Sequence, residues 1–249
     1  MLEDAIRYPW TGEQRVETLA IGGVLSLLGV FFLPILFVYG YLVRVIRQVA
    51  NGDTDAPPVF DEWEELLVDG LVVFGISLVY VLVPSLVLAA GTVVWLVPVG
   101  VGVGVGGNGG GVLAVLGALL ALFVTLLGFL ALLGAFYLVP AAVAAYALTG
   151  RFASAFSPST LRTVGTDGSY AVAWVVAIVV GFLAQVVVGF LAQVVGGVFT
   201  LTLVGAVLVP FVTFYGNVAG AYAIGTGVAE TALGPESSDA ESPAGRPAV

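Results

Sequence analysis

The sequence of 249 residues contains no cysteine and no histidine, and its seven basic residues are all arginine. Without cysteine or histidine, the chain has no thiol nucleophile, no disulfide and none of the commonest zinc and haem ligands. Without lysine, a phosphate-binding P-loop is excluded. So few basic residues form no patch that could neutralise a nucleic-acid backbone. We therefore expect a protein that is not an enzyme, has no cofactor and binds no nucleic acid.

Charge is also scarce and unevenly placed. The chain is 60% hydrophobic with a mean hydropathy of +1.13, and charged residues are absent from 18–43, 70–150 and 168–229. Each run exceeds the ~20 residues that a helix needs to cross a bilayer. A soluble protein of 25.5 kDa has too little interior to bury all three runs. The sequence therefore predicts an integral membrane protein whose first partner is the lipid bilayer.

The charges that are present are mostly acidic. Sixteen acidic residues against seven arginines give a formal net charge of −9. An acidic surface without lysine is typical of proteins in very high salt, where like charges are screened. The alternative is an acidic membrane protein from ordinary surroundings. We expect a salt-adapted, halophilic protein.

The apolar runs predict an all-α fold, a polytopic transmembrane helical bundle with proline-kinked helices. The first run can be one long helix bent at Pro34, or a hairpin that turns at 29–34. The hairpin would have limbs of only about 15 residues, which are shorter than a full span, so we favour the single helix and five segments over six. The five segments are 18–46, 71–97, 112–149, 170–196 and 198–229.

The polar stretches define the expected organisation of a single membrane-embedded domain over 1–229. Leu2, Ile6 and Trp10 share one helical face, which predicts an amphipathic helix on the membrane surface. The three polar stretches are this interfacial segment (1–17), an acidic cytoplasmic loop (44–70) and an acidic disordered tail (230–249).

Arginine placement predicts the orientation. Arg44, Arg47, Arg151 and Arg162 lie in loops that five alternating spans put on one side. The positive-inside rule makes that side cytoplasmic. We expect a multi-pass protein of the cytoplasmic membrane with its C-terminal tail inside the cell, although the N-terminal arginines would then lie outside.

The segment 57–70, "PPVFDEWEELLVDG", is the most informative polar stretch. Asp61 is a candidate N-cap, followed by acidic residues that suit the first turn of a helix. Trp63 and the leucines on its side predict an interfacial helix with a solvated acidic face. The alternative is a divalent-cation site, because Asp61, Glu65 and Asp69 recur every four residues.

A repeated heptapeptide, GFLAQVV, occurs at 181–187 and 189–195. It belongs to a series of small or amide residues spaced by four, which traces a ridge on one helix. Such small-xxx-small ridges let a neighbouring helix approach closely, and amides can hydrogen-bond across helices. We expect interhelical packing in preference to a substrate site. The helix-packing candidates are Ala173, Ala177, Gly181, Gln185, Gly189, Gln193 and Gly197.

The run 21–71 carries a recognisable pattern: an apolar helix, G-Y-L-x-R, a short glycine-containing loop, proline, D-x-W and D-G-L. The chain is similar here to a bacterial and archaeal membrane family, domain of unknown function 4013. The second half resembles members from salt-loving archaea in 139–156, 167–174 and 211–216. The resemblance implies a multi-spanning membrane topology and no activity. The pattern residues are Gly40, Tyr41, Leu42, Arg44, Gly52, Pro57 or Pro58, Asp61, Trp63, Asp69, Gly70 and Leu71.

No acidic residue, arginine or histidine lies inside the apolar runs, which argues against proton-coupled transport. We expect a non-enzymatic membrane scaffold or accessory component that contacts other membrane proteins. The alternative is a transporter or channel for an uncharged or lipid-like solute, with helices broken at Pro34, Pro140 and Pro210.

Overall fold

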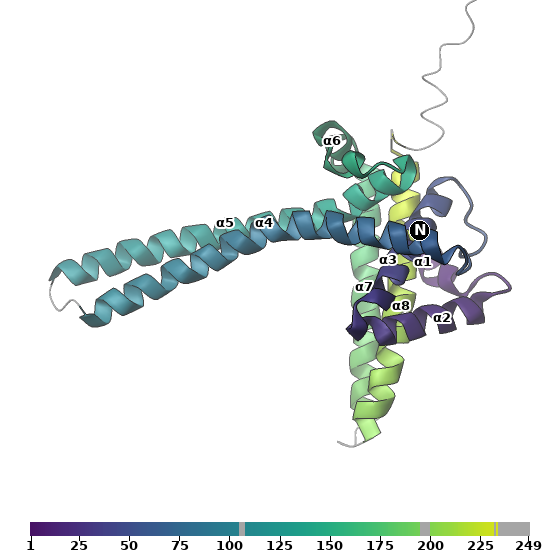
Figure 1. The fold of residues 1–249 in the computed structure, drawn as a ribbon, viewed down its shortest axis with the longest axis horizontal. Helices are drawn as coiled ribbons and strands as arrows, with labels where there is room; N and C mark the ends of the chain where they lie inside the picture. Colours follow the sequence, from purple (N-terminus) through teal and green to yellow (C-terminus); the bar gives the residue numbers. More distant parts are fainter. Residues whose placement is uncertain (105–107, 195–199, 232, 234–249) are drawn as a thin grey trace, which may run out of the picture. The chain divides into compact units, whose positions relative to one another are not determined.

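A computed structural model of the chain describes residues 1–104, 108–194, 200–231 and 233. For those of these residues that lie within 95–114 and 191–207, it describes the backbone and not the side chains. All regular elements of this part are helices (Figure 1), which confirms the all-α class. They are α1 (Leu2–Arg7), η1 (Tyr8–Trp10), α2 (Arg15–Leu27), η2 (Leu28–Phe31), α3 (Leu33–Ala50), α4 (Trp63–Gly104), α5 (Asn108–Thr149), η3 (Phe152–Phe156), α6 (Pro158–Gly165), α7 (Gly168–Val194) and α8 (Thr200–Ala229).

Five of these helices are long and apolar enough to cross a membrane. A sixth candidate is the bent pair Leu2–Trp10 and Arg15–Phe31, whose halves meet at 91°. The chain is therefore a multi-pass membrane protein, as predicted. The five stretches are Leu33–Ala50, Trp63–Val94, Val115–Thr149, Gly168–Phe190 and Leu208–Ala229.

The prediction of one long first helix bent at Pro34 is wrong. The helix breaks at Phe32, whose φ of +65° no helix accommodates. Pro34 instead lies in the first turn of α3, where a missing N–H is tolerated. The break falls within 29–34, where the hairpin alternative placed its turn. By contrast, α5 and α8 continue through Pro140 and Pro210, and kinks at these two prolines stay predictions.

The contacts of the chain divide into two compact units, one formed by Met1–Gly75 with Pro140–Val249 and the other by Ile76–Val139. The predicted single domain over 1–229 stays a prediction. Within the predicted interfacial segment, Leu2, Ile6 and Trp10 are exposed while Ala5 and Tyr8 are buried, and a position of this segment on the membrane surface stays a prediction. Most of the predicted disordered tail, 234–249, lies outside the described residues.

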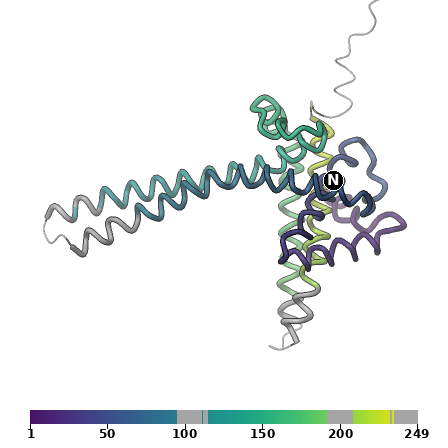
Figure 2. The backbone as a smooth tube through the Cα atoms, viewed as in Figure 1, coloured from purple at the N-terminus to yellow at the C-terminus, as the bar shows by residue number. Residues whose placement is uncertain are grey.

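In the first unit, α8 packs against α1, α2, α3 and α7. Figure 2 shows α7 and α8 side by side. Glycines allow the close contacts: a Cβ on Gly227 would lie 2.2 Å from that of Ala173, and one on Gly225 would lie 2.9 Å from that of Val49. On α2, Gly22 accommodates the ring of Phe214. Small residues thus let four helices share one central helix.

The tightest contact of the first unit joins α3 to α4. A Cβ on Gly40 would lie 1.8 Å from the carbonyl oxygen of Leu66, and one on Gly70 would lie 1.9 Å from that of Leu36. The two helices therefore touch backbone to backbone, with one glycine from each side. We refer to this contact and the residues around it as the α3–α4 junction.

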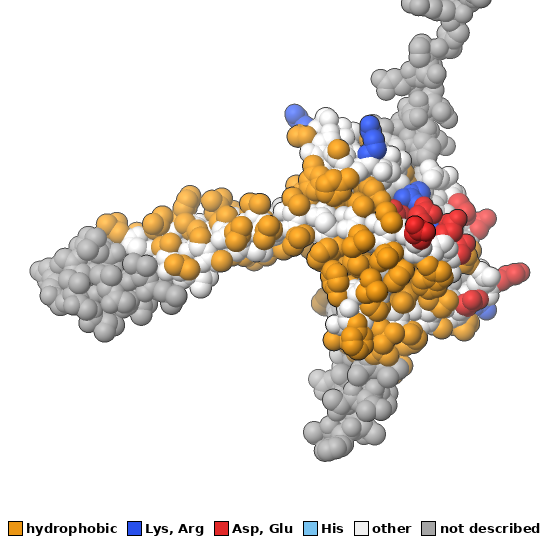
Figure 3. Space-filling model, viewed as in Figure 1, with side chains coloured by type: hydrophobic (Ala, Val, Ile, Leu, Met, Phe, Trp, Pro, Cys, Tyr) orange, Lys and Arg blue, Asp and Glu red, His pale blue; other side chains and the backbone are white. Residues whose placement is uncertain are grey.

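The second unit is a hairpin made by the later part of α4 and the earlier part of α5. Its helices also meet through small residues, because a Cβ on Gly91 would lie 2.6 Å from the hydroxyl oxygen of Thr125. Large apolar side chains on both helices, such as Leu86 and Phe123, are more than half exposed within the described chain. Hydrophobic side chains also dominate the visible face of the molecule in Figure 3. Surfaces of this kind suit a lipid environment.

Substituting a junction glycine should destabilise the protein. Gly40→Ala or Gly70→Ala places a methyl group on a backbone carbonyl, so we expect a loss of about 3 kcal/mol of unfolding free energy. Helicity followed during SDS titration of the protein in mild detergent measures this. Gly181→Ala is the control, because nothing lies within 4 Å of its added methyl. Equal unfolding midpoints for all three variants would contradict the close approach.

Candidate functional site

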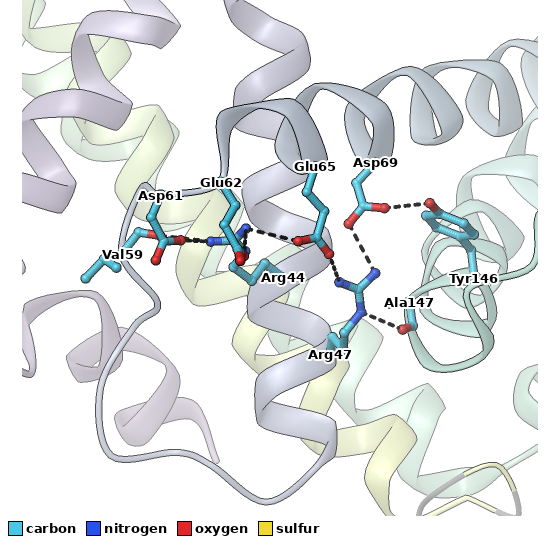
Figure 4. A network of polar contacts seen from close by, with 9 residues as sticks. All are labelled: Arg44, Arg47, Val59, Asp61, Glu62, Glu65, Asp69, Tyr146 and Ala147. Atoms are coloured by element: carbon cyan, nitrogen blue, oxygen red, sulfur yellow. Dashed lines mark hydrogen bonds and ion pairs between the residues drawn. The ribbon is translucent and has the colours of Figure 1, made fainter.

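Two arginines on the last turns of α3 face a row of acidic side chains at the start of α4. Arg44 and Arg47 are one helical turn apart, so both project toward the same neighbour. Four carboxylates lie opposite them: Asp61 and Glu62 just before α4, and Glu65 and Asp69 on its first turns (Figure 4). The backbone contact of Gly40 and Gly70 brings the helices close enough for these side chains to pair.

Arg44 holds the outer half of this network. Its side chain is only 14% exposed and forms ion pairs with Asp61, with Glu62 at 3.2 Å and with Glu65 at 3.7 Å. It also donates to the carbonyl oxygen of Val59 at 3.3 Å. The carboxylate partners are more than half exposed. Exposed pairs contribute little individually, so this half mainly orients the loop that precedes α4.

Arg47 holds the inner half and joins three helices. Its guanidinium contacts Asp69 at 3.1 Å and Glu65 at 3.5 Å on α4, and its Nε donates to the carbonyl oxygen of Ala147 on α5 at 2.9 Å. That carbonyl belongs to the last turn of α5, where a cation complements the helix dipole.

Asp69 is the most buried charged group of the network, with 8% of its side chain exposed. One of its oxygens accepts from Arg47, and the other accepts from the hydroxyl of Tyr146 at 2.5 Å. Both oxygens are therefore paired, which is the condition for keeping a carboxylate in an apolar setting. The arrangement fixes α3, α4 and α5 together and leaves no free acid or base at its centre.

Hydrogen bonds and aromatic rings fix the loop between α3 and α4. The hydroxyl of Tyr41 donates to the carbonyl oxygen of Pro58 at 2.9 Å, and the ring of Tyr41 stacks on Phe60 with centroids 4.2 Å apart. Tyr8 and Gln48 both donate to the carbonyl oxygen of Ala56, at 3.2 and 2.8 Å. The predicted acidic loop over 44–70 is thus an ordered connection, and both of its ends are helical.

Two expectations for 57–70 change with this geometry. Asp61 is not the N-cap: α4 begins at Trp63, and the carbonyl of Glu62 accepts the first helical hydrogen bond from Leu66 at 3.1 Å. The carboxylate of Asp61 pairs with Arg44 instead. The cation alternative also loses its ligands, since arginines occupy Asp61, Glu65 and Asp69. Among the described residues, no group of three acidic side chains has the geometry to hold a metal ion.

The sequence reasoning missed the pairing itself, although the signal was present. Arg44 and Arg47 are spaced by three, and Asp61, Glu65 and Asp69 are spaced by four. Both spacings put charges of one sign on one face of a helix. Two adjacent helices with complementary faces favour a structural ion-pair network over a solvated face.

The structure separates the predicted packing residues of α7. Ala173 is buried against Gly227 of α8, and Ala177 lies 3.8 Å from a Cβ built on Gly220. Gly181 and Gly189 have open space where a Cβ would lie. Each step of four residues turns about 40° around a helix, so the ridge leaves α8 after Ala177. The contact with α8 continues at Val180, which is buried, and at Ala184, whose Cβ would meet one on Gly216.

Gln185 lies on the exposed side of α7, within the candidate span Gly168–Phe190. No hydrogen bond recorded within the described part of the chain involves its amide. The side chain of Gln193 and all of Gly197 lie outside the described residues. Helix packing through the amides therefore stays a prediction, and no described helix of this chain provides a packing partner for the Gln185 amide.

Comparisons with known proteins agree with the sequence pattern. The model of a family described as a protein of unknown function, DUF4013, matches residues 24–193. The match includes the α3–α4 junction and ends before α8, so the similarity noted at 211–216 lies outside it. Searches of curated proteins and of solved structures each gave no significant match.

Several pattern residues of 21–71 lie at the junction. Gly40 and Gly70 make the backbone contact, Tyr41 holds the loop, and Arg44 pairs with Asp61. These pattern residues therefore join two helices.

Breaking the inner half of the network should cost more than breaking the outer half. Asp69→Asn removes the buried partner of Arg47, so we expect a loss of about 3 kcal/mol of unfolding free energy. Asp61→Asn removes a carboxylate that is 58% exposed, and the expected loss is below about 1 kcal/mol. SDS titration of both variants tests the order. A larger loss for Asp61→Asn would contradict the assignment of Asp69 as the central carboxylate.

Proposed function

Because the chain belongs to the DUF4013 family, whose function is unknown, we propose its function from its own surfaces: a non-enzymatic membrane scaffold or accessory component. In this proposal, the α3–α4 junction holds the helices in a fixed frame. Exposed helix faces then bind helices of other membrane proteins.

The exposed amide of Gln185 carries the proposal. It lies beside the exposed apolar side chains of Phe182 and Val186, within a membrane span. An amide facing hydrocarbon without a partner is unfavourable by several kcal/mol. A polar group on a neighbouring helix removes that cost, and such contacts contribute about 0.6–2 kcal/mol in membranes. Gly181 and Gly189, one turn away on either side, leave room for a helix backbone.

The use of charge within the chain supports a structural role. Arg44 and Arg47 pair with carboxylates, and Asp69 accepts from Arg47 and Tyr146. These groups stabilise helix contacts and are not directed into an open cleft. Unpaired acids or bases in a cleft are the usual mark of membrane enzymes and proton-coupled carriers.

The placement of arginine supports an orientation within this proposal. Arg44 and Arg47 lie at the end of α3, and Arg47 contacts the end of α5. The positive-inside rule favours a cytoplasmic position for this end of the first unit, in the cytoplasmic membrane. The tail that follows α8 would then be cytoplasmic. The acidic, lysine-free composition favours work in high salt.

Transport of an uncharged or lipid-like solute is less well supported. The transport hypothesis requires membrane helices that are broken at Pro34, Pro140 and Pro210. Pro34 lies in the first turn of α3, and the helical assignment continues through Pro140 and Pro210. Although the chain breaks at Phe32, the continuity of α5 and α8 through their prolines suits a scaffold better than a gated path.

Loss of the Gln185 amide should release a partner. Membrane proteins that copurify with the full-length chain in mild detergent at native salt should be reduced severalfold by Gln185→Leu, because the interhelical hydrogen bond is lost. Quantitative mass spectrometry of the purified material measures this. Val186→Leu, an exposed neighbour without an amide, is the control. The proposal fails if no protein copurifies with the unsubstituted chain, or if both variants retain the same set.

A further inference from the structure

An apolar groove lies between α1–η1, α2, α7 and α8 of the first unit. Its volume is about 640 Å³, and its lining includes Trp10, Val16, Leu19, Leu183, Val187 and Phe211. Tyr215 also lines it, but its hydroxyl donates to the carbonyl oxygen of Ile6 at 2.5 Å. The groove therefore presents a hydrocarbon surface with its one phenolic group already paired.

A smaller polar pocket is lined by the segment that joins η1 to α2. It measures about 260 Å³, and Thr11, Glu13, Gln14, Arg15 and Thr18 contribute its polar lining. Trp10 and Val16, on either side of this segment, line the apolar groove. A hydrophobic cavity and a polar pocket thus share one connecting segment.

Arg15 lines the polar pocket and lies over Trp10, whose side chain lines the apolar groove. Its guanidinium carbon is 5.5 Å from the ring centroid of Trp10, a cation–π contact. Among the described residues, no carboxylate forms an ion pair with Arg15, whereas Arg7 pairs with Glu3 at 2.8 Å. Arg15 is therefore a cation that is held in place and available to an anionic group.

We propose that this composite site binds a phospholipid, with one hydrocarbon chain in the apolar groove and the phosphodiester beside Arg15. A groove of this composition in a membrane protein is filled by hydrocarbon because water there would be unfavourable. Arginine pairs strongly with phosphate oxygens, and tryptophan favours the headgroup level. The carboxylate of Glu13 in the polar pocket disfavours a second negative charge, which selects a phosphodiester over a phosphomonoester.

This site is separate from the scaffolding face, because Gln185 does not line the groove. The proposal concerns a bound lipid and goes beyond the proposed function, so either can fail alone. A neutral lipid, a free hydrocarbon or a helix of a second copy would make different use of the groove. None of these would require Arg15.

Fluorescence quenching of Trp10 tests the site. The full-length protein in mild detergent is titrated with phosphatidylglycerol that carries brominated acyl chains, since bromine quenches a nearby indole. The signal of a Trp10→Phe variant isolates the contribution of Trp10. We expect saturable quenching of Trp10. Arg15→Gln should weaken binding roughly fivefold, because it removes one cation beside the phosphate, whereas Arg7→Gln should leave it unchanged.

The groove itself is tested with two neighbouring valines of α7. Val187 lines the groove and Val186 does not, and both are nearly half exposed. Val187→Phe should fill the groove and reduce quenching severalfold, while Val186→Phe should not. Unchanged helicity by circular dichroism shows that each variant is folded.

Three results would overturn the proposal. Brominated diacylglycerol with the same chains could bind as tightly as the phospholipid and be insensitive to Arg15→Gln, which would mean that the phosphate contributes nothing. Alternatively, Val187→Phe and Val186→Phe could behave alike, which would place the lipid elsewhere. Concentration-dependent self-association without saturable quenching would identify the occupant as a second copy and also reject the lipid.

Discussion

The backbone contact between α3 and α4 is the constraint on which the first unit depends. Gly40 and Gly70 allow each helix to touch a carbonyl of the other, at positions where no side chain fits. At that distance, Arg44 and Arg47 reach the carboxylates at the start of α4, and Arg47 also reaches the end of α5. The ion pairs are thus a consequence of the close approach, and they make it unfavourable for the helices to separate.

The sequence predicted the class of the protein well because charge-free apolar runs longer than about 20 residues are long enough to cross a bilayer as helices, which satisfy their own backbone hydrogen bonds. It offered a turn within 29–34 only as the less favoured hairpin alternative, and it did not predict the pairing of the acidic segment with Arg44 and Arg47. A φ of +65° is uncommon for phenylalanine, so Phe32 itself gives no local signal for the break. The pairing could have been inferred from the complementary spacings. The residues of α7 that contact α8 could not have been inferred from the four-residue spacing alone. A ridge with this spacing winds around its helix, and it stays near α8 only at Ala173 and Ala177.

The two proposals rest on the same principle, that a polar group beside hydrocarbon is stabilised by a polar partner. In each case the polar group is exposed on an apolar surface. Gln185 has an amide within a membrane span, and Arg15 has a guanidinium beside an apolar groove. Each group is unfavourable next to hydrocarbon alone and favourable next to a matching partner. We propose another helix as the matching partner of the amide and a phosphate as that of the guanidinium. The frame held by the α3–α4 junction positions the exposed surfaces without taking part in either interaction.

A double-mutant cycle between Arg47 and Asp69 tests the central role of the junction most directly. Unfolding free energies of the unsubstituted protein, Arg47→Gln, Asp69→Asn and the double variant give the coupling between the two side chains. The account predicts a coupling of about 2 kcal/mol, because the pair is largely buried and joins three helices. The exposed pair Arg7 and Glu3, treated in the same way, should give less than about 0.5 kcal/mol. A coupling near zero between Arg47 and Asp69 would contradict the account.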